Sequence, residues 1–95
     1  MLSIKIDDLL KIQNPNIIDI RSEQSYNNNH IPNSKNIPYE KLLTNYKNYL
    51  DRNKKYYIYC QKGIMSARIC GKLSSMGYNV ASIIGGYEAW ILKEK

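Results

Sequence analysis

The chain has 95 residues, which is enough for a single domain with one modest core over residues 1–95 and too few for two domains. Its apolar runs are only a few residues long and its first residues lack the features of a signal peptide, so we expect no membrane segment and a cytoplasmic protein. The lysines behind the net charge of +6 are dispersed without a basic stripe, which argues against nucleic-acid binding.

The first half of the chain alternates between short apolar runs and helical periods. We predict strands in this half over residues 3–6, 16–20 and 36–38. A first helix is expected after the cap Asp7, and Asn14-Pro15-Asn16 ends it. Its expected apolar positions are Leu9, Leu10 and Ile12.

The segment between the second and fourth predicted strands is more polar. Ser22 is expected to cap a short helical turn, with Tyr26 as its apolar contact. Residues 27–29 read as a polar turn and residues 30–35 as a loop. A longer helix is predicted over residues 40–50.

The second half repeats the same alternation. Strands are predicted over residues 54–59 and 79–84, and helices over residues 65–76 and 87–92. Gly77 is expected to end the longer helix, Gly85-Gly86 to turn the chain against the last helix, and Trp90 to fill the core. Strands that alternate with helices predict βαβ units, and therefore an α/β protein with a parallel sheet covered on both faces.

The strand over residues 54–59 leads directly into Cys60, at the edge of the sheet where ligands bind in such proteins. A short loop containing Gly63 then opens a helix. In such a turn, backbone N–H groups and the helix dipole favour the thiolate, and Lys62 adds a cation at the rim. We therefore predict a nucleophilic Cys60, the alternative being a small buried apolar residue.

Four other polar or reactive side chains bear on the site. Asp19 ends an apolar strand, where a carboxylate must be hydrogen-bonded or paired, and Arg21 is the candidate partner. His30 could form a dyad with Cys60, but its loop position beside Pro32 favours a structural hydrogen bond. Cys70 lies more than two helical turns from Cys60 and is expected to be a packed residue rather than a resolving thiol. One histidine and two cysteines cannot complete a zinc site.

Four separated segments resemble the rhodanese (sulfurtransferase) domain over about residues 4 to 92. They are Ile17-Ile18-Asp19-Ile20-Arg21, His30-Ile31-Pro32 with Asn36-Ile37-Pro38, the Cys60 loop, and Gly77-Tyr78-Asn79-Val80 running into Gly85-Gly86-Tyr87-Glu88-Ala89-Trp90. The resemblance implies a three-layer α/β/α fold with a five-stranded parallel sheet, and a cysteine that carries a persulfide. It also implies a substrate-binding loop formed by Gln61, Lys62, Gly63, Ile64, Met65 and Ser66, supported structurally by Asp19, Arg21 and His30, with no metal or organic cofactor.

The Cys60 loop departs from the family pattern at two positions. Many single-domain members have arginine directly after the cysteine and again five places on, where this chain has Gln61 and Met65. Lys62-Gly63 still resembles the Lys-Gly of thiosulfate-using members. Because arginine is the side chain best suited to hold a doubly charged anion, thiosulfate becomes doubtful as the donor.

The sequence therefore favours a sulfurtransferase in which Cys60 takes sulfur from thiosulfate or a persulfide and passes it to a thiol, cyanide or protein acceptor. A second reading is a non-catalytic binding module or a persulfide carrier dedicated to one partner. A cysteine-loop phosphatase or arsenate reductase is disfavoured, because Ser66 stands where those enzymes place their arginine and Arg68 comes too late. The oligomeric state is left open.

Overall fold

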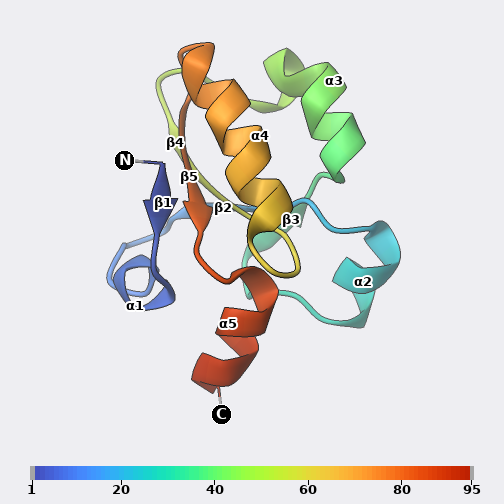
Figure 1. Ribbon diagram of the computed structural model, residues 1–95, viewed down its shortest axis with the longest axis vertical. Coiled ribbons are helices and arrows are strands. Elements are labelled where there is room, and N and C mark those ends of the chain that lie inside the picture. Colours follow the sequence, from blue (N-terminus) through green and yellow to red (C-terminus); the bar gives the residue numbers. More distant parts are fainter. Residues whose placement is uncertain (1, 95) are drawn as a thin grey trace.

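Five short strands form one parallel sheet in the computed structural model, which describes residues 2–94 (Figure 1). The strands are β1 (Ser3–Ile4), β2 (Asn16–Asp19), β3 (Ser34–Asn36), β4 (Lys55–Tyr59) and β5 (Asn79–Ile83). Their order across the sheet is β1-β5-β4-β2-β3, and every neighbouring pair is parallel. The predicted five-stranded parallel sheet is confirmed, and β4, which leads to Cys60, is its central strand.

Helices cover both faces of this sheet, as predicted for a three-layer α/β/α protein (Figure 1). They are α1 (Ile6–Leu9), α2 (Glu23–Asn28), α3 (Tyr39–Tyr49), α4 (Ile64–Ser75) and α5 (Gly86–Glu94). Leu42 of α3 and Ile69 and Leu73 of α4 are fully buried in the core on one face. Leu9 of α1 and Tyr87 of α5 belong to the core on the other face, against which Trp90 is partly buried.

The alternation of side chains along β4 decides which way Cys60 points. Ile58 is buried in the core beneath α3 and α4, whereas Tyr57 and Tyr59 are buried in the core beneath α1 and α5. Successive side chains of a strand face opposite sides of a sheet, so Cys60 follows Ile58 to the α4 side. Ser82, which follows Val80 by two residues on β5, faces the same side.

The predictions at the N-terminal end were partly wrong. The strand stops at Ile4, and Lys5, not Asp7, is the N-cap, because its carbonyl accepts the N–H groups of Asp8 and Leu9. Ile6 therefore starts the helix instead of ending the strand. The helix is only four residues long and leaves Leu10 53% exposed, so Leu10 is not a core position.

The third strand was predicted two residues too late. The observed strand β3 pairs with β2 over three residues, so that Ser34 lies opposite Ile17 and Asn36 lies opposite Asp19. Pro38 has no N–H to donate to a ladder, and it occupies the N-cap of α3 instead. The remaining boundaries agree within about two residues, with Ser22 as the cap of α2 and Gly77, at φ 92°, directly after the C-cap of α4.

Candidate active site

The side chain of Cys60 lies at the carboxyl end of β4, under the first turn of α4, and is only 7% exposed. The backbone N–H groups of Gly63 and Ser66 donate to its sulfur at N···S distances of 3.1 and 3.3 Å. The Ser66 hydroxyl lies 3.5 Å from the same sulfur. Donors directed at one sulfur from a helix N-terminus stabilise negative charge on it, which is the state in which a cysteine is a nucleophile.

The N-terminus of α5 braces the Cys60 loop from outside. The N–H of Tyr87 donates to the carbonyl of Cys60 at 2.9 Å, and the N–H of Glu88 donates to the carbonyl of Gln61 at 3.1 Å. Gly86 permits this approach, since a Cβ atom on it would lie 2.4 Å from the Cys60 carbonyl oxygen. The hydrogen bonds from α5 to the carbonyls of Cys60 and Gln61 hold the loop in the conformation in which the N–H groups of Gly63 and Ser66 point at the sulfur.

Gly85-Gly86 therefore has two tasks, of which the sequence predicted one. The expected packing against the last helix is present at Gly85, where an added Cβ would lie 2.7 Å from the Cβ of Ala89. The contact between Gly86 and the Cys60 loop was missed. A pair of glycines after a strand indicates a close approach, but it does not say which distant segment approaches.

Asp19 and Arg21 form a buried ion pair beside the loop. Asp19 is fully buried, and its Oδ2 accepts the Nη2 of Arg21 at 2.8 Å. The guanidinium lies 4.1 Å from the ring centroid of Tyr87, and its Nη1 donates to Oε1 of Gln61 at 3.3 Å. Burial opposes the charge of Arg21, but the hydrogen bond and charge of Asp19 outweigh it and raise the pKa of Arg21. The pair thus joins the end of β2, the start of α5 and the loop.

His30 has structural contacts. Its Nδ1 lies 2.8 Å from the carbonyl oxygen of Tyr26, and its ring stacks on the Tyr26 ring with the centroids 3.7 Å apart. Within residues 2–94 no hydrogen bond joins His30 to Cys60. The described residues therefore show no Cys60–His30 dyad, and His30 instead has a structural hydrogen bond to the helix α2.

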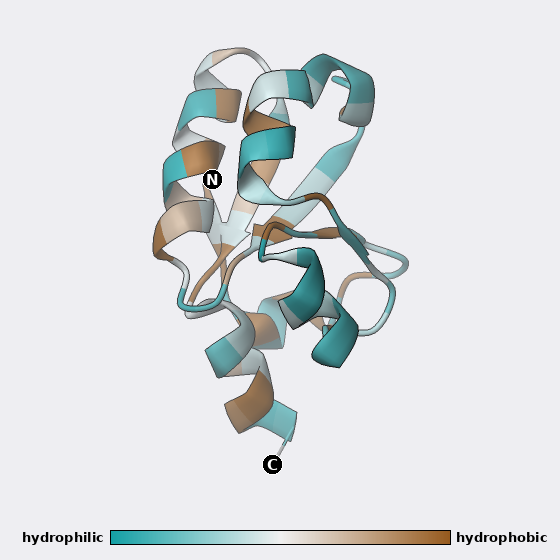
Figure 2. Cartoon of the chain, turned by 90° about the vertical axis from the view of Figure 1, so that its right-hand side faces the viewer, coloured by the Kyte–Doolittle hydropathy of each residue, from teal (hydrophilic) through white to brown (hydrophobic). Residues whose placement is uncertain are grey.

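The rim of the Cys60 loop carries apolar side chains. Ile64 is 65% exposed and Met65 is 37% exposed, both in the first turn of α4. Figure 2 shows this turn in the hydrophobic colour, in contrast to the hydrophilic α2. Lys62 is exposed in the same loop. A substrate that reaches the sulfur therefore meets apolar surface and one lysine of the loop.

Cys70, unlike Cys60, lies away from the loop and inside the core. It is fully buried on α4, and burial, followed by the charge of Cys60, raises its pKa to about 12. Cys70 therefore stays a protonated thiol at neutral pH, as expected of a packed residue. Its side chain belongs to the core beneath α3 and α4.

Comparison with known proteins agrees with this geometry. A family model described as Rhodanese-like domain matches residues 5–93. The chain belongs to the rhodanese family. The thiosulfate sulfurtransferase GlpE of Coxiella burnetii is 34% identical over 84 residues, which cover 87% of this chain and 78% of that protein. Because the chain has a rhodanese domain and is similar to this enzyme over most of its length, the protein is a rhodanese-type sulfurtransferase.

Solved structures of rhodanese proteins have the same fold. A rhodanese-related protein from Thermoplasma volcanium superimposes with a TM-score of 0.90 at 34% identity, covering 98% of this chain and 93% of that one. A rhodanese-like domain protein from Staphylococcus aureus gives a TM-score of 0.83 at 32% identity, covering 95% of this chain and 91% of that one. The predicted family and fold are therefore confirmed.

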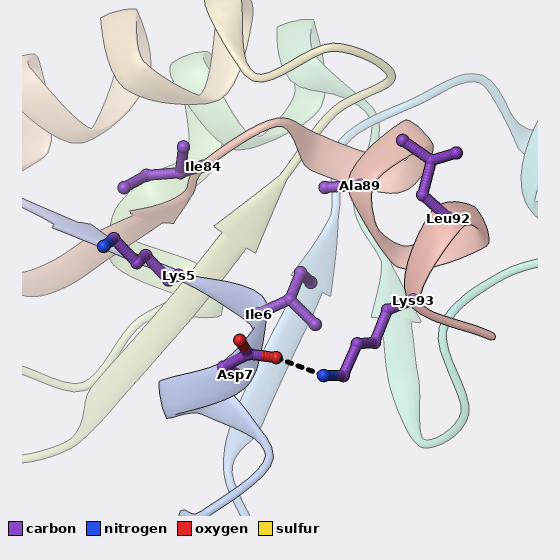
Figure 3. Close-up of a pocket in the computed structure, with 7 residues that line it drawn as sticks. All are labelled: Lys5, Ile6, Asp7, Ile84, Ala89, Leu92 and Lys93. Carbon is purple, nitrogen blue, oxygen red and sulfur yellow. Dashed lines mark ion pairs between the residues drawn. The ribbon is translucent and has the colours of Figure 1, made fainter. Parts of the chain in front are cut away.

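A surface pocket of about 390 Å³ lies apart from the Cys60 loop, between the N-terminal segment and α5 (Figure 3). Ile6, Ile84 and Leu92 contribute its apolar lining, and an ion pair of 2.6 Å joins Asp7 to Lys93 at its edge. No cysteine, serine or histidine lines this pocket, so nothing in it resembles the thiol site at Cys60.

Residues 2–94 contain neither a cluster of metal-binding side chains nor a helix that could span a membrane. No three of the histidine, cysteine, aspartate and glutamate side chains in this range are grouped so that they could hold a metal ion. None of the helices over the same residues combines the length and the apolar character that a membrane span requires.

Sequence reasoning also missed Ser82. This serine is 3% exposed, and its Oγ lies 2.7 Å from the Oγ of Ser66, which in turn lies beside the Cys60 sulfur. The signal was available, because Ser82 is the one polar residue in the run Val80-Ala81-Ser82-Ile83-Ile84. A buried hydroxyl needs a hydrogen-bond partner, but only the folded chain shows which partner it has.

Proposed function

We propose that Cys60 carries sulfane sulfur as a persulfide between a sulfur donor and an acceptor. The observation that supports this most directly is the pair of N–H donors, from Gly63 and Ser66, on the Cys60 sulfur. With a persulfide donor, the Cys60 thiolate attacks the terminal sulfur of R–S–SH, the S–S bond of the donor breaks, and R–S⁻ leaves with the proton as R–SH. The charge then resides on the outer sulfur of Cys60–S–S⁻.

The loop is suited to the second half of the cycle as well. A thiolate acceptor attacks the outer sulfur, the Cys60 S–S bond breaks, and Cys60 returns as the thiolate while the acceptor becomes the persulfide. Backbone N–H groups of residues 61–66 hold the anion in both states, and the exposed Lys62 attracts anionic substrates. Incubation with a persulfide donor followed by intact mass measurement tests the proposal, because one added sulfur atom is expected.

We propose an organic or protein persulfide, rather than thiosulfate, as the preferred donor. Gln61 and Met65 replace the two arginines that many single-domain members have, and Ile64 adds exposed apolar surface to the same rim. Arg21 does not replace them, because its guanidinium is engaged by Asp19, Tyr87 and Gln61. A small dianion therefore finds one lysine in the loop, whereas a donor with an apolar part finds a matching rim.

The replacement Met65→Arg should lower the Michaelis constant for thiosulfate. One regained charge-assisted hydrogen bond contributes at most about 1.5–3 kcal/mol, so a decrease of about tenfold is expected. Steady-state kinetics with thiosulfate and cyanide measure it. Leu10→Arg is the matched control, because it adds the same charge at a residue that is also exposed but lies outside the Cys60 loop. An equal decrease in both variants would contradict the assignment of Met65 to the donor site.

We expect no turnover of an aryl phosphate. Phosphoryl transfer needs strong stabilisation of the equatorial oxygens, and Ser66 stands where cysteine-loop phosphatases place an arginine. The assay uses an aryl phosphate and a sulfur donor on the same preparation. Phosphate turnover that is lost in Cys60→Ser would overturn the sulfurtransferase assignment of this loop.

A persulfide carrier dedicated to one protein partner is the second candidate function. The 65% exposure of Ile64 beside the loop favours it, because exposed apolar groups next to a reactive centre suit a protein surface better than a small anion. The two candidates differ in turnover. An enzyme cycles with small thiols, whereas a dedicated carrier accepts one sulfur atom and holds it until its partner is added.

A further inference from the structure

Ser82 lies under the Cys60 loop, within the central part of the sheet. It belongs to β5, directly beside Ile58 of β4, and its side chain faces the α4 side, as Cys60 does. Its Oγ lies 2.7 Å from the Oγ of Ser66, and that atom lies 3.5 Å from the Cys60 sulfur. Ser66 is fully buried and Ser82 is 3% exposed, so this chain of hydroxyl groups is shielded from solvent.

The protons on this chain can be counted. Each hydroxyl has one proton to donate and two lone pairs to accept with. When Cys60 is a thiol, its S–H donates to Ser66, and the Ser66 proton goes to Ser82 or to the carbonyl of Gly63, which lies 3.3 Å away. When Cys60 is a thiolate, its sulfur only accepts. The Ser66 proton can then turn from the Gly63 carbonyl or Ser82 toward the sulfur, and the Ser66 oxygen, which has lost the S–H as a donor, needs a new one.

Ser82 is the hydroxyl in position to be that donor. We propose that Ser82 is a positioning residue that donates to Ser66 and thereby lets Ser66 donate to the Cys60 thiolate. The inference rests on the proposed role of Cys60 as the sulfur carrier. Without Ser82, Ser66 gains its bond to the sulfur only by leaving its own buried oxygen without a donor, which costs much of what the new bond contributes.

The hydrogen bonds from Ser82 to Ser66 and from Ser66 to the sulfur matter at two points of the transfer cycle. Cys60 Sγ carries the negative charge before it attacks the donor, and again when it leaves as the acceptor takes the outer sulfur. In the persulfide itself the charge has moved one sulfur outward. Ser82 should therefore favour the nucleophile and the leaving group without holding the persulfide, and its loss should slow the two sulfur-transfer steps.

Other groups also influence the charge on Cys60. The charged and titratable side chains on the elements around it include Tyr59 on β4, Lys62 in the loop, Arg68, Cys70 and Lys72 on α4, Tyr87, Glu88, Lys93 and Glu94 on α5, and the Asp19–Arg21 pair at the end of β2. All of them are unchanged when Ser82 is replaced. A change in thiolate formation in a Ser82 variant can therefore be assigned to the hydroxyl.

The test compares Ser82→Ala with Ser82→Thr, which keeps the hydroxyl. Ser34→Ala is the matched control, because Ser34 is also a buried strand serine whose Oγ lies near another hydroxyl, that of Tyr59, at 3.2 Å. Ultraviolet absorbance of the thiolate against pH and the single-turnover rate of sulfur transfer to a thiol are measured. We expect Ser82→Ala to move thiolate formation to higher pH and to slow transfer by about threefold to tenfold.

Ser82→Thr should stay close to the unmodified protein in both measurements, and Ser34→Ala should change neither. Thermal unfolding of each variant separates lost stability from lost positioning. The inference is overturned if Ser82→Ala leaves both the thiolate titration and the transfer rate unchanged, or if Ser34→Ala shifts them equally. Failure of the proposed function would give a different result, because the unmodified protein would then take up no sulfur on Cys60.

Discussion

Replacement of Cys60 by serine should abolish sulfur transfer completely. A serine hydroxyl is not ionised near neutral pH and is a poor nucleophile toward sulfur, so the N–H groups of Gly63 and Ser66 would have no anion to stabilise. The measurement is the intact mass after incubation with a persulfide donor, together with sulfur transfer to cyanide or a thiol. Cys60→Ser should show neither added sulfur nor turnover.

Cys70→Ala provides the matched control for this loss. Cys70 is fully buried in an apolar core and its pKa is raised to about 12, so it is neither accessible nor ionised at neutral pH. Alanine keeps the site apolar, at the cost of a small cavity. Cys70→Ala should still take up one sulfur atom and transfer it. Loss of the persulfide in Cys70→Ala, or its retention in Cys60→Ser, would show that the wrong sulfur has been assigned.

Replacement of Gly86 by alanine should damage both the fold and the reaction. Gly86 has a φ of 59°, and a Cβ atom there would meet three backbone atoms of the Cys60 loop, the nearest at 2.4 Å. Because backbone cannot rotate away as a side chain can, the loop and the start of α5 must separate. We expect a loss of about 2–3 kcal/mol in the free energy of unfolding.

The catalytic loss in Gly86→Ala should exceed the loss of stability. Separation of α5 from the loop breaks the bonds from Tyr87 and Glu88 to the loop carbonyls, and a displacement of about 1 Å at the sulfur costs about a hundredfold in rate. Denaturant unfolding and single-turnover kinetics measure the two effects. Gly71→Ala is the control, because nothing lies within 4 Å of a Cβ at that helical position.

Gly71→Ala should leave sulfur transfer unchanged and raise stability by about 0.5–1 kcal/mol, as alanine favours a helix more than glycine does. If Gly86→Ala behaved like Gly71→Ala, the brace between α5 and the Cys60 loop would have no functional role. The two variants make the same chemical change, so any difference between them comes from the surroundings of the two glycines.

The Arg21–Gln61 hydrogen bond gives a structural reason for glutamine at position 61. Gln61 stands where many single-domain relatives have arginine, and its Oε1 accepts the Nη1 of Arg21 at 3.3 Å. A glutamine can accept this hydrogen bond, whereas an arginine at the same position has no acceptor and would bring a second positive charge beside Arg21. The substitution therefore links the loop to the Asp19–Arg21 pair and lowers the positive charge at its rim.

Local patterns predicted the elements of this protein and the position of Cys60 between a strand and a helix N-terminus. Short apolar runs that alternate with helical periods indicated the βαβ order, and a strand ending in Cys60 before a glycine loop indicated a thiol at a helix N-terminus. Both inferences need only neighbours in sequence. For the same reason the N-cap Ser22 and the helix-ending Gly77 were placed correctly. The errors, at Asp7 and at the third strand, came where several residues could have served as the boundary.

The long-range contacts at the site were decided by the tertiary structure alone. Ser82 reaches Ser66 only because β5 lies beside β4, and Gly86 reaches the Cys60 carbonyl only because the N-terminus of α5 packs against the loop. Arg21 likewise reaches Gln61 across 40 positions of sequence. A polar residue in an apolar strand, or a pair of glycines, indicates that another segment of the chain makes close contact there. The partner itself depends on strand order and helix placement, which arise from packing of the whole sheet and not from any local preference.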